Sequence, residues 1–505
     1  MATAFQNISE ALESFLFCNE EVKRKSAEEF LNQIPSADFT GGIFEYLSAL
    51  NLRKPECNEL AAILLKKQYI DKTENLQKIP QDILQQMTQT LESTITAERK
   101  VVYLKRVFEI LVKIYTQSNS SDNLINLITK YSQTTESNIK KGLMYLIEIS
   151  CEYSFDDTQL MQNSSKISSI FMHYLEDKDP LVQSLSLKSL VTFLNSIEDE
   201  NNLRKFSDVF PLLISKCVNC LKADEESGLT SLTSITDLIE THPKFVKQIT
   251  NDFLNLFTEI LDNFISAAIR IKALTAILTL CATNNAQVRK SDVFKQKTIF
   301  SIMKLMAESS QLSLEEWTEE LEDNKLSQND AASAAEETLA KIGYELGNKF
   351  LFPLFAPLIK EAVLQNNQWN VQCAGINAIA YLAEGSKEIC KQEDLQNLVL
   401  MIKQAVHNNQ ENPRIQYAAL TAFSLLAAEY TPELQETMAK SLFRLFLKFR
   451  KYQHQTPIQS NLINNKLLQR SRRQKYTLKF QCRTYFVQNI SYFLIKYYQY
   501  QLKIT

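Results

Sequence analysis

The hydrophobic positions of this chain repeat a three-slot pattern about once every forty residues. In the stretch from Asn367 to Ala383, polar residues come first and apolar residues follow at Val371, Ile376 and Ile379. At 100° per residue, slots that are five and eight residues after the first fall within about 140° of the helix circumference. The pattern therefore predicts an amphipathic helix with one buried face.

The same pattern fits ten segments of the chain, with one polar slot at Ser227. The triplets are Val22/Ala27/Phe30, Cys57/Ala62/Leu65, Val102/Val107/Ile110, Ile139/Met144/Ile147, Val182/Leu187/Leu190, Ser227/Leu232/Ile235, Ile269/Leu274/Ile277, Ala334/Leu339/Ile342, Val371/Ile376/Ile379 and Ile415/Leu420/Phe423. Successive first slots lie 35, 45, 37, 43, 45, 42, 65, 37 and 44 residues apart. Except for the interval of 65, these lie near the period of HEAT and armadillo repeats, which is about 40–47 residues.

Each interval has room for another helix before the patterned one. Residues 210–221 and 352–363 are two such segments, and Pro211 suits a first helical turn. Polar turns such as 176–180 and 408–413 separate the two helices. We predict an all-α fold, a right-handed HEAT/ARM-like α-solenoid superhelix of about ten two-helix repeats.

Composition favours this fold and argues against most enzymes. The chain has 505 residues, of which 45% are hydrophobic, but only 8 are glycine and 11 are proline. Phosphate loops, nucleotide-binding fingerprints and nucleophile elbows need glycines at fixed spacing, and none of these motifs is present, nor is a zinc-protease HExxH motif. The four histidines lie far apart in the sequence. We expect no enzyme, no catalytic residue and no cofactor.

Cysteine usage indicates packed thiols. The nine cysteines are scattered, and a single CxxC, Cys217 to Cys220, sits within an apolar helical pattern without a second pair or a histidine pair for zinc. We expect no metal site and a reducing compartment. The N-terminus has no secretory-signal pattern, and no apolar run reaches the roughly 18 residues of a membrane span.

The long interval contains an acidic insertion. Six of the nine residues from Glu315 to Asp323 are carboxylic acids, and Trp317 lies among them. Such a cluster is either solvating filler or an interaction segment. The tryptophan favours interaction, because an exposed tryptophan is costly unless a partner covers it. We therefore predict a partner-binding acidic loop formed by Glu315, Glu316, Trp317, Glu319, Glu320, Glu322 and Asp323.

The net charge of −3 hides a split between the body and the last 55 residues. Residues 451–505 hold ten Lys/Arg and no carboxylate, which leaves 45 basic and 58 acidic side chains, a net charge of −13, in residues 1–450. An acidic body attracts basic proteins and repels nucleic acid. The tail, which is rich in Tyr, Asn and Gln, is either a basic segment for RNA or a membrane surface or a sequence that is not native protein. We favour the second interpretation, with no direct nucleic-acid or membrane partner.

Several segments, in order, resemble the importin-β family of nuclear transport receptors. Residues 11–31 and 59–67 are similar to its opening repeats. The insertion at 315–323, with 335–339 and 351–354, resembles the beta-3 type within that family. Residues 369–376, 381–385 and 413–419 extend the similarity, so that it spans roughly residues 1–450.

The resemblance implies a carrier that shuttles between cytoplasm and nucleus. Such a carrier binds basic cargo, such as ribosomal proteins or histones, on its inner surface and passes the nuclear pore through FG-repeat nucleoporins. It releases cargo when Ran binds in its GTP form. The family uses its first repeats and its acidic loop for Ran. Trp369 and Glu384 are further candidate partner-binding residues, although a helix end closed by Gly385 explains Glu384 as well. We expect a monomer.

The resemblance also has departures. The family continues for about as many repeats again. Many HEAT repeats have an arginine after the first slot, which joins an Asp–Arg ladder. This chain has Gln183, Gln372 and Gln416, and it keeps Arg270. The loss of the ladder predicts a looser stack.

The predicted organisation has five parts: N-terminal repeats at 1–115, central repeats at 116–310, the acidic insertion at 311–333, further repeats at 334–450 and the tail at 451–505. A HEAT scaffold subunit of a phosphatase-like or other assembly is the alternative from another class, and uniform repeats without an insertion would favour it. An export receptor is a variant of the carrier.

Overall fold

The computed structural model describes residues 7–37, 39–96, 99–118, 120–308, 330–365, 368–383, 392–409 and 412–430. Its described elements are helices, with no strand among them. By internal contacts the chain divides into two units, residues 1–245 and 246–505. The acidic loop, Glu384 and the tail lie outside the described residues.

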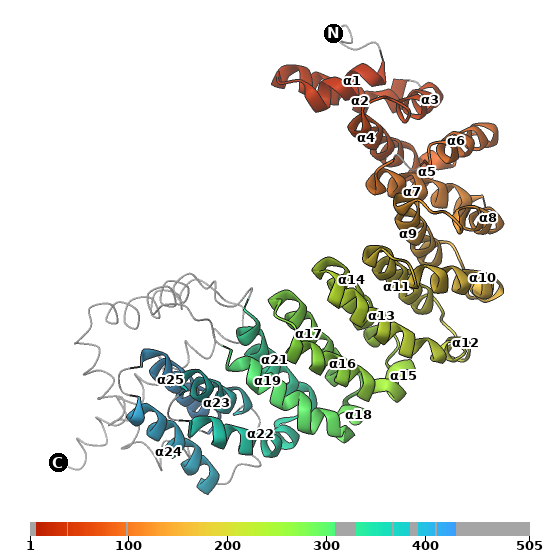
Figure 1. Ribbon diagram of the computed structural model, residues 1–505. Coiled ribbons are helices and arrows are strands. Elements are labelled where there is room, and N and C mark those ends of the chain that lie inside the picture. The colour runs from red at the N-terminus through yellow and green to blue at the C-terminus, as the bar shows by residue number, and fades with distance from the viewer. Residues whose placement is uncertain are drawn as a thin grey trace. The chain divides into compact units, whose positions relative to one another are not determined.

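The first unit is a series of helix pairs (Figure 1). The pairs are α1 (Ile8–Phe17) with α2 (Glu21–Ala37), α3 (Phe39–Ala49) with α4 (Pro55–Leu65), α6 (Gln81–Ser93) with α7 (Val101–Gln117), α8 (Ser121–Tyr131) with α9 (Ser137–Tyr153), α10 (Asp157–Leu175) with α11 (Pro180–Asn195), and α13 (Phe210–Ala223) with α14 (Glu225–Thr241). Short elements join them: η1 (Lys66–Ile70), α5 (Thr73–Leu76), α12 (Glu200–Arg204), η2 (Ser207–Val209) and α15 (Pro243–Val246), which reaches the unit boundary.

The second unit continues the same arrangement. Its pairs are α16 (Thr250–Asn263) with α17 (Ala267–Thr283), α19 (Ile299–Met306) with α21 (Ala331–Leu346), α22 (Asn348–Val363) with α23 (Trp369–Leu382), and α24 (Gln392–Asn408) with α25 (Pro413–Glu429). The short elements η3 (Lys247–Ile249), α18 (Asn285–Lys290) and η4 (Phe294–Thr298) complete it. The described chain thus contains ten pairs, and the ten predicted patterned helices are the second helices of these pairs.

The second helices stack on one another within each unit. In the first unit α4, α7, α9, α11 and α14 form this row, and in the second unit α17, α21, α23 and α25 do. From Cys57 onward, the second and third slots of each triplet are buried wherever the side chain is described. Burial of one apolar face per helix against the next pair is what holds a solenoid together. The predicted all-helical solenoid is confirmed.

The prediction that the first slot of each triplet is buried is wrong for two triplets. Val22 is 78% exposed and Val102 is 48% exposed, whereas the equivalent Val182 is fully buried. Both exposed valines are the second residue of their helix, and Val182 is the third. The spacing to the second and third slots is the same in all three triplets, so the two valines are not rotated around the helix. They lie in the first turn, where the packing leaves them exposed. In the first repeat, α1 rather than α2 makes the principal contact with α4.

Polar residues in the turns fix the beginnings of the second helices. The Asp179 carboxylate accepts a hydrogen bond from the Leu181 N–H at 3.0 Å, directly before Pro180 begins α11. Asn412 accepts from the Arg414 N–H at 3.0 Å, directly before Pro413 begins α25. Side-chain caps satisfy N–H groups that have no partner in the first turn, and proline is tolerated there. The two predicted turns are therefore helix starts, as their sequences indicated.

Candidate interaction face on the second-helix rows

The predicted partner-binding residues fall into two groups. The acidic loop and Glu384 lie outside the described residues, so their role stays a prediction. The described residues on either side of the loop are anchored: Glu308 forms an ion pair with Arg270, and Asp330 caps α21 by accepting from the Ser333 N–H at 3.2 Å. The loop therefore leaves from and returns to fixed positions beside the second-helix row of the second unit.

Trp369 is described and lies at the first residue of α23. The guanidinium carbon of Arg414, at the start of α25, is 4.6 Å from the centroid of its ring. The neighbouring Asn370 donates a hydrogen bond to the Ala307 carbonyl oxygen at 2.7 Å. Trp369 is half-buried in this joint between repeats. The contact with Arg414 gives Trp369 a structural role, and partner binding by its exposed part stays a prediction.

A hydrogen-bonded cluster that the sequence analysis missed joins α21 to α23. The Glu336 carboxylate accepts from Asn377 Nδ2 at 2.6 Å and from the Tyr381 hydroxyl at 3.3 Å. Burial, followed by the negative charge of Glu336, raises the pKa of Tyr381, so the phenol stays protonated and can donate. This cluster places a part-buried carboxylate between α21 and α23.

The first unit has a related cluster, which joins the second helices of two consecutive repeats, α7 and α9. The Glu109 carboxylate accepts from the Tyr145 hydroxyl and lies 2.9 Å from Lys66 Nζ and 3.0 Å from Arg106 Nη1. Burial alone would raise the pKa of Glu109, but hydrogen bonds from Tyr145, Lys66 and Arg106 outweigh it and lower the pKa.

Further along the same row, Lys188 Nζ pairs with Glu148 at 2.8 Å. Glu109 and Glu148 are therefore both matched by cations. Together the clusters show a recurring signal that the sequence contained, namely a tyrosine 36 residues after Glu109 and another 45 residues after Glu336.

Glutamine hydrogen bonds and lysine ion pairs are found where HEAT repeats often have an Asp–Arg ladder. Gln183 Nε2 donates to the Asp177 carbonyl oxygen at 2.6 Å, and Gln372 Nε2 donates to the Val363 carbonyl oxygen at 3.2 Å. Lysines supply the charged links between repeats: Lys140 to Asp177 at 2.6 Å, and Lys141 to Asp179 at 2.8 Å. The turn before α11 is therefore linked to α9 by lysines, and a looser stack stays a prediction.

The CxxC cysteines are packed thiols, as predicted. Cys217 and Cys220 are both buried in α13, and both are free. Burial raises the pKa of each thiol, which keeps it protonated. Within the described part of the chain, no group of three or more His, Cys, Asp or Glu side chains is arranged to hold a metal ion. Nor does any described helix combine the length and apolarity that crossing a bilayer requires.

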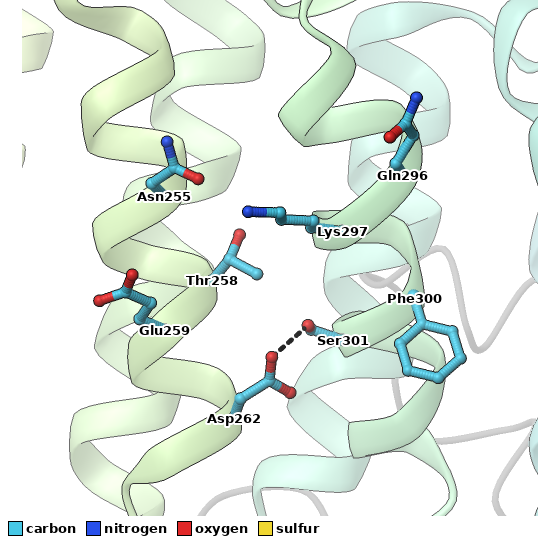
Figure 2. A pocket seen from close by; sticks show the side chains of 8 residues that line it. All are labelled: Asn255, Thr258, Glu259, Asp262, Gln296, Lys297, Phe300 and Ser301. Carbon is cyan, nitrogen blue, oxygen red and sulfur yellow. Dashed lines mark hydrogen bonds between the residues drawn. The ribbon is translucent and has the colours of Figure 1, made fainter.

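A cavity of about 280 Å³ lies between first helices of neighbouring pairs in the second unit, α16 on one side and η4 with α19 on the other (Figure 2). Ser301 Oγ donates to Asp262 Oδ2 at 2.9 Å across its floor, and Lys304 lies 3.4 Å from the same carboxylate. Figure 2 shows the Lys297 side chain extending into the space and the Phe300 ring pointing out of it. Opposite charges share the lining, so the cavity does not select one sign of ligand.

Two family models of importins match parts of this chain. The family model described as IPO5-like, TPR repeats, matches residues 111–256, and the model described as Importin repeat matches residues 262–353. Importin subunit beta-3 of Saccharomyces cerevisiae is 21% identical over 278 residues, which are 54% of this chain and 25% of that protein. Over residues 111–256 and 262–353 the chain is therefore similar to importins. The matching models and this relative are described as importins, which agrees with the prediction that the chain is not an enzyme.

Solved structures of the karyopherin Kap121p share the fold of this chain. The match to Kap121p alone has a TM-score of 0.73 at 15% identity and covers 98% of this chain and 50% of that one. Kap121p bound to RanGTP matches with a TM-score of 0.68 at 15% identity, covering 85% and 41%. Kap121p bound to Nup53p matches with a TM-score of 0.72 at 15% identity, covering 87% and 42%. The chain thus spans half or less of the length of these relatives.

Proposed function

We propose that this chain acts as a nuclear import receptor of the beta-3 type, or as part of one. It binds basic protein cargo, such as ribosomal proteins or histones, docks to FG-repeat nucleoporins and releases cargo when Ran binds in its GTP form. In this proposal it shuttles between cytoplasm and nucleus as a monomer. The observation that carries the proposal is the ordered match to importin models over residues 111–353, on a solenoid that resembles Kap121p.

The physical chemistry of the second-helix rows supports capture of basic segments. The body of the chain has a net charge of −13, and the row includes the Glu336 carboxylate, which accepts from Asn377 and Tyr381. A long surface with many carboxylates attracts a basic segment quickly and in a salt-sensitive way. A competitor that binds the same surface would release the segment.

The acidic loop is the proposed link between cargo and Ran. Its six carboxylates lie between Glu308 and Asp330, both of which are fixed beside the second-helix row. A loop with this charge can contact either partner. The importin models that match this chain favour the carrier over the phosphatase scaffold.

The proposal is tested by capture of a basic ribosomal protein on beads, with and without RanGTP. We expect the chain to bind this cargo and RanGTP to displace it. A variant in which the six loop carboxylates are serines should bind cargo or Ran more weakly, with a larger loss at low than at high salt. Cargo capture that is unaffected by RanGTP would refute the carrier proposal. If the loop variant bound cargo and Ran as the parent chain does, the loop would be solvating filler and not a binding segment.

A further inference from the structure

The second unit carries a concentrated basic patch on the side chains of α18, η4 and the start of α22. Residues 284–300 contain four Lys/Arg and a single carboxylate, Asp292, within a body whose net charge is −13. We name the Arg289 patch after its central residue, and it consists of Arg289, Lys290, Lys295 and Lys349. None of these residues belongs to the second-helix row described above.

Two stacked phenylalanines hold the Arg289 patch together. The Phe294 and Phe350 rings are stacked with centroids 6.4 Å apart, and the Arg289 guanidinium carbon lies 5.8 Å from the Phe350 centroid. A guanidinium over an aromatic face is attracted by the ring and keeps its donors available. Arg289 is exposed, so its N–H groups can reach a ligand in solvent.

The backbone around Arg289 adds to the positive potential. The backbone at Gly347 lies close to Arg289, since a Cβ built on this glycine would be 3.8 Å from Arg289 Nη2. The φ of Gly347 is 77°, a conformation that suits glycine. Helix α22 begins directly after it with no side-chain cap, so the positive end of the helix lies beside the guanidinium. Lys349, in the first turn of α22, is exposed at the same place.

The remaining lysines are positioned by the backbone of α18. Lys295 Nζ donates to the Lys290 carbonyl oxygen at 3.2 Å and lies 3.4 Å from Asp292 Oδ1. Lys290 is exposed. Asp292, between α18 and η4, and Glu345, before the start of α22, are the carboxylates near these four cations, so the patch keeps an excess of positive charge.

We propose that the Arg289 patch binds a short acidic segment, rich in Asp and Glu, of a partner protein. Carboxylates match the planar donors of Arg289 and the ammonium groups around it. A short segment feels mainly the local field, because charges beyond about 8–10 Å are screened at physiological salt. A long, densely charged nucleic acid would extend over the acidic body and be repelled by it. This surface and its acidic partner are independent of the proposed cargo and Ran binding.

The test uses the full chain and a fluorescein-labelled peptide of twelve residues that alternates Glu and Asp with Ser. Fluorescence anisotropy gives its Kd for the parent chain, for the Arg289→Glu/Lys290→Glu variant and for a control, Lys222→Glu/Lys360→Glu. The control changes the net charge equally at two exposed lysines outside the patch. Circular dichroism melting checks that all three proteins are folded.

We expect the patch variant to bind the acidic peptide at least about tenfold more weakly, and the control to change the affinity by less than about threefold. Equal losses in both variants would mean that net charge alone attracts the peptide and would overturn the proposal. So would no binding by the parent chain. A single-stranded oligonucleotide of equal charge that binds more tightly through the same two residues would replace the acidic protein segment as the ligand.

Discussion

The Lys140 ammonium lies 2.6 Å from the Asp177 carboxylate, one repeat further along the chain. The same turn holds two more lysines, because Asp179 pairs with Lys141 at 2.8 Å and Glu176 pairs with Lys216. Lys140 and Lys141 come from α9, and Lys216 comes from α13 on the far side. A single acidic turn thus links three consecutive repeats of the first unit.

We predict that Asp177→Asn lowers the free energy of unfolding by about 1–2 kcal/mol at pH 7. Burial would raise the pKa of Asp177, but hydrogen bonds from Lys140 and the Asp179 N–H lower it below its usual range. A carboxyl whose pKa is lower in the folded state stabilises the fold above its unfolded pKa, near 3.9. That contribution is lost as the pH falls below about 4. Urea unfolding at pH 7 and pH 3 measures the difference.

A double-mutant cycle with Lys140→Met separates the pair from its surroundings. Asp177→Asn in the Lys140→Met background should cost clearly less than in the parent chain. If the cost is the same in both backgrounds, or the parent and Asp177→Asn differ as much at pH 3 as at pH 7, Lys140 does not stabilise the Asp177 carboxylate.

We predict opposite outcomes for the same substitution at two equivalent slots. Val182→Ala should destabilise the chain by about 1.5–3 kcal/mol, because two buried methyl groups are removed from a packed face. Val22→Ala should change the free energy of unfolding by less than about 0.5 kcal/mol, because Val22 is 78% exposed. Urea unfolding of both variants checks this. If Val22→Ala lowered the free energy of unfolding as much as Val182→Ala, Val22 would be buried, which would contradict the structure.

We predict that Gly375→Ala destabilises the second unit by about 1–3 kcal/mol. A Cβ at Gly375 would lie 2.9 Å from Ala362 Cβ and 3.2 Å from the Val363 backbone nitrogen, so α22 and α23 would have to separate. An ordinary helical glycine would instead gain up to about 1 kcal/mol on becoming alanine. The sign of the change in unfolding midpoint therefore decides whether the two helices approach as closely as described.

We predict selective thiol labelling in the native protein. Burial raises the pKa of Cys217 and Cys281, whereas Cys18 is partly exposed. Because the thiolate is the reactive form, iodoacetamide at pH 8 should modify Cys18 and leave Cys217 and Cys281 intact until denaturant is added. Mass spectrometry of peptides reads the result. Labelling of Cys217 at the rate of Cys18 would contradict the packing of α13.

The fold could be predicted because each repeat encodes its own buried face. The slots at Leu187, Leu190 and their equivalents report burial that depends only on helix periodicity. Burial of the first slot was harder to predict, since Val22 and Val102 match the pattern in residue type and spacing but are exposed in the first turn of their helices. Periodicity does not report where a helix begins relative to its neighbour.

The candidate site was harder to predict because its residues meet between repeats. Glu336 and Tyr381 are 45 residues apart, and neither belongs to a motif. A sequence search at one repeat length for a carboxylate and a hydroxyl donor would have found them. The basic patch was hidden by averaging, because its charge is cancelled in the net charge of the body.

The most direct test of the carrier account is the affinity of the purified chain for Ran in its two nucleotide states. Biolayer interferometry with immobilised chain should show RanGTP bound at least about tenfold more tightly than RanGDP, a difference of about 1.4 kcal/mol or more. Equal affinity for the two nucleotide states, or no binding of either, would contradict the proposal that this chain is a Ran-regulated carrier.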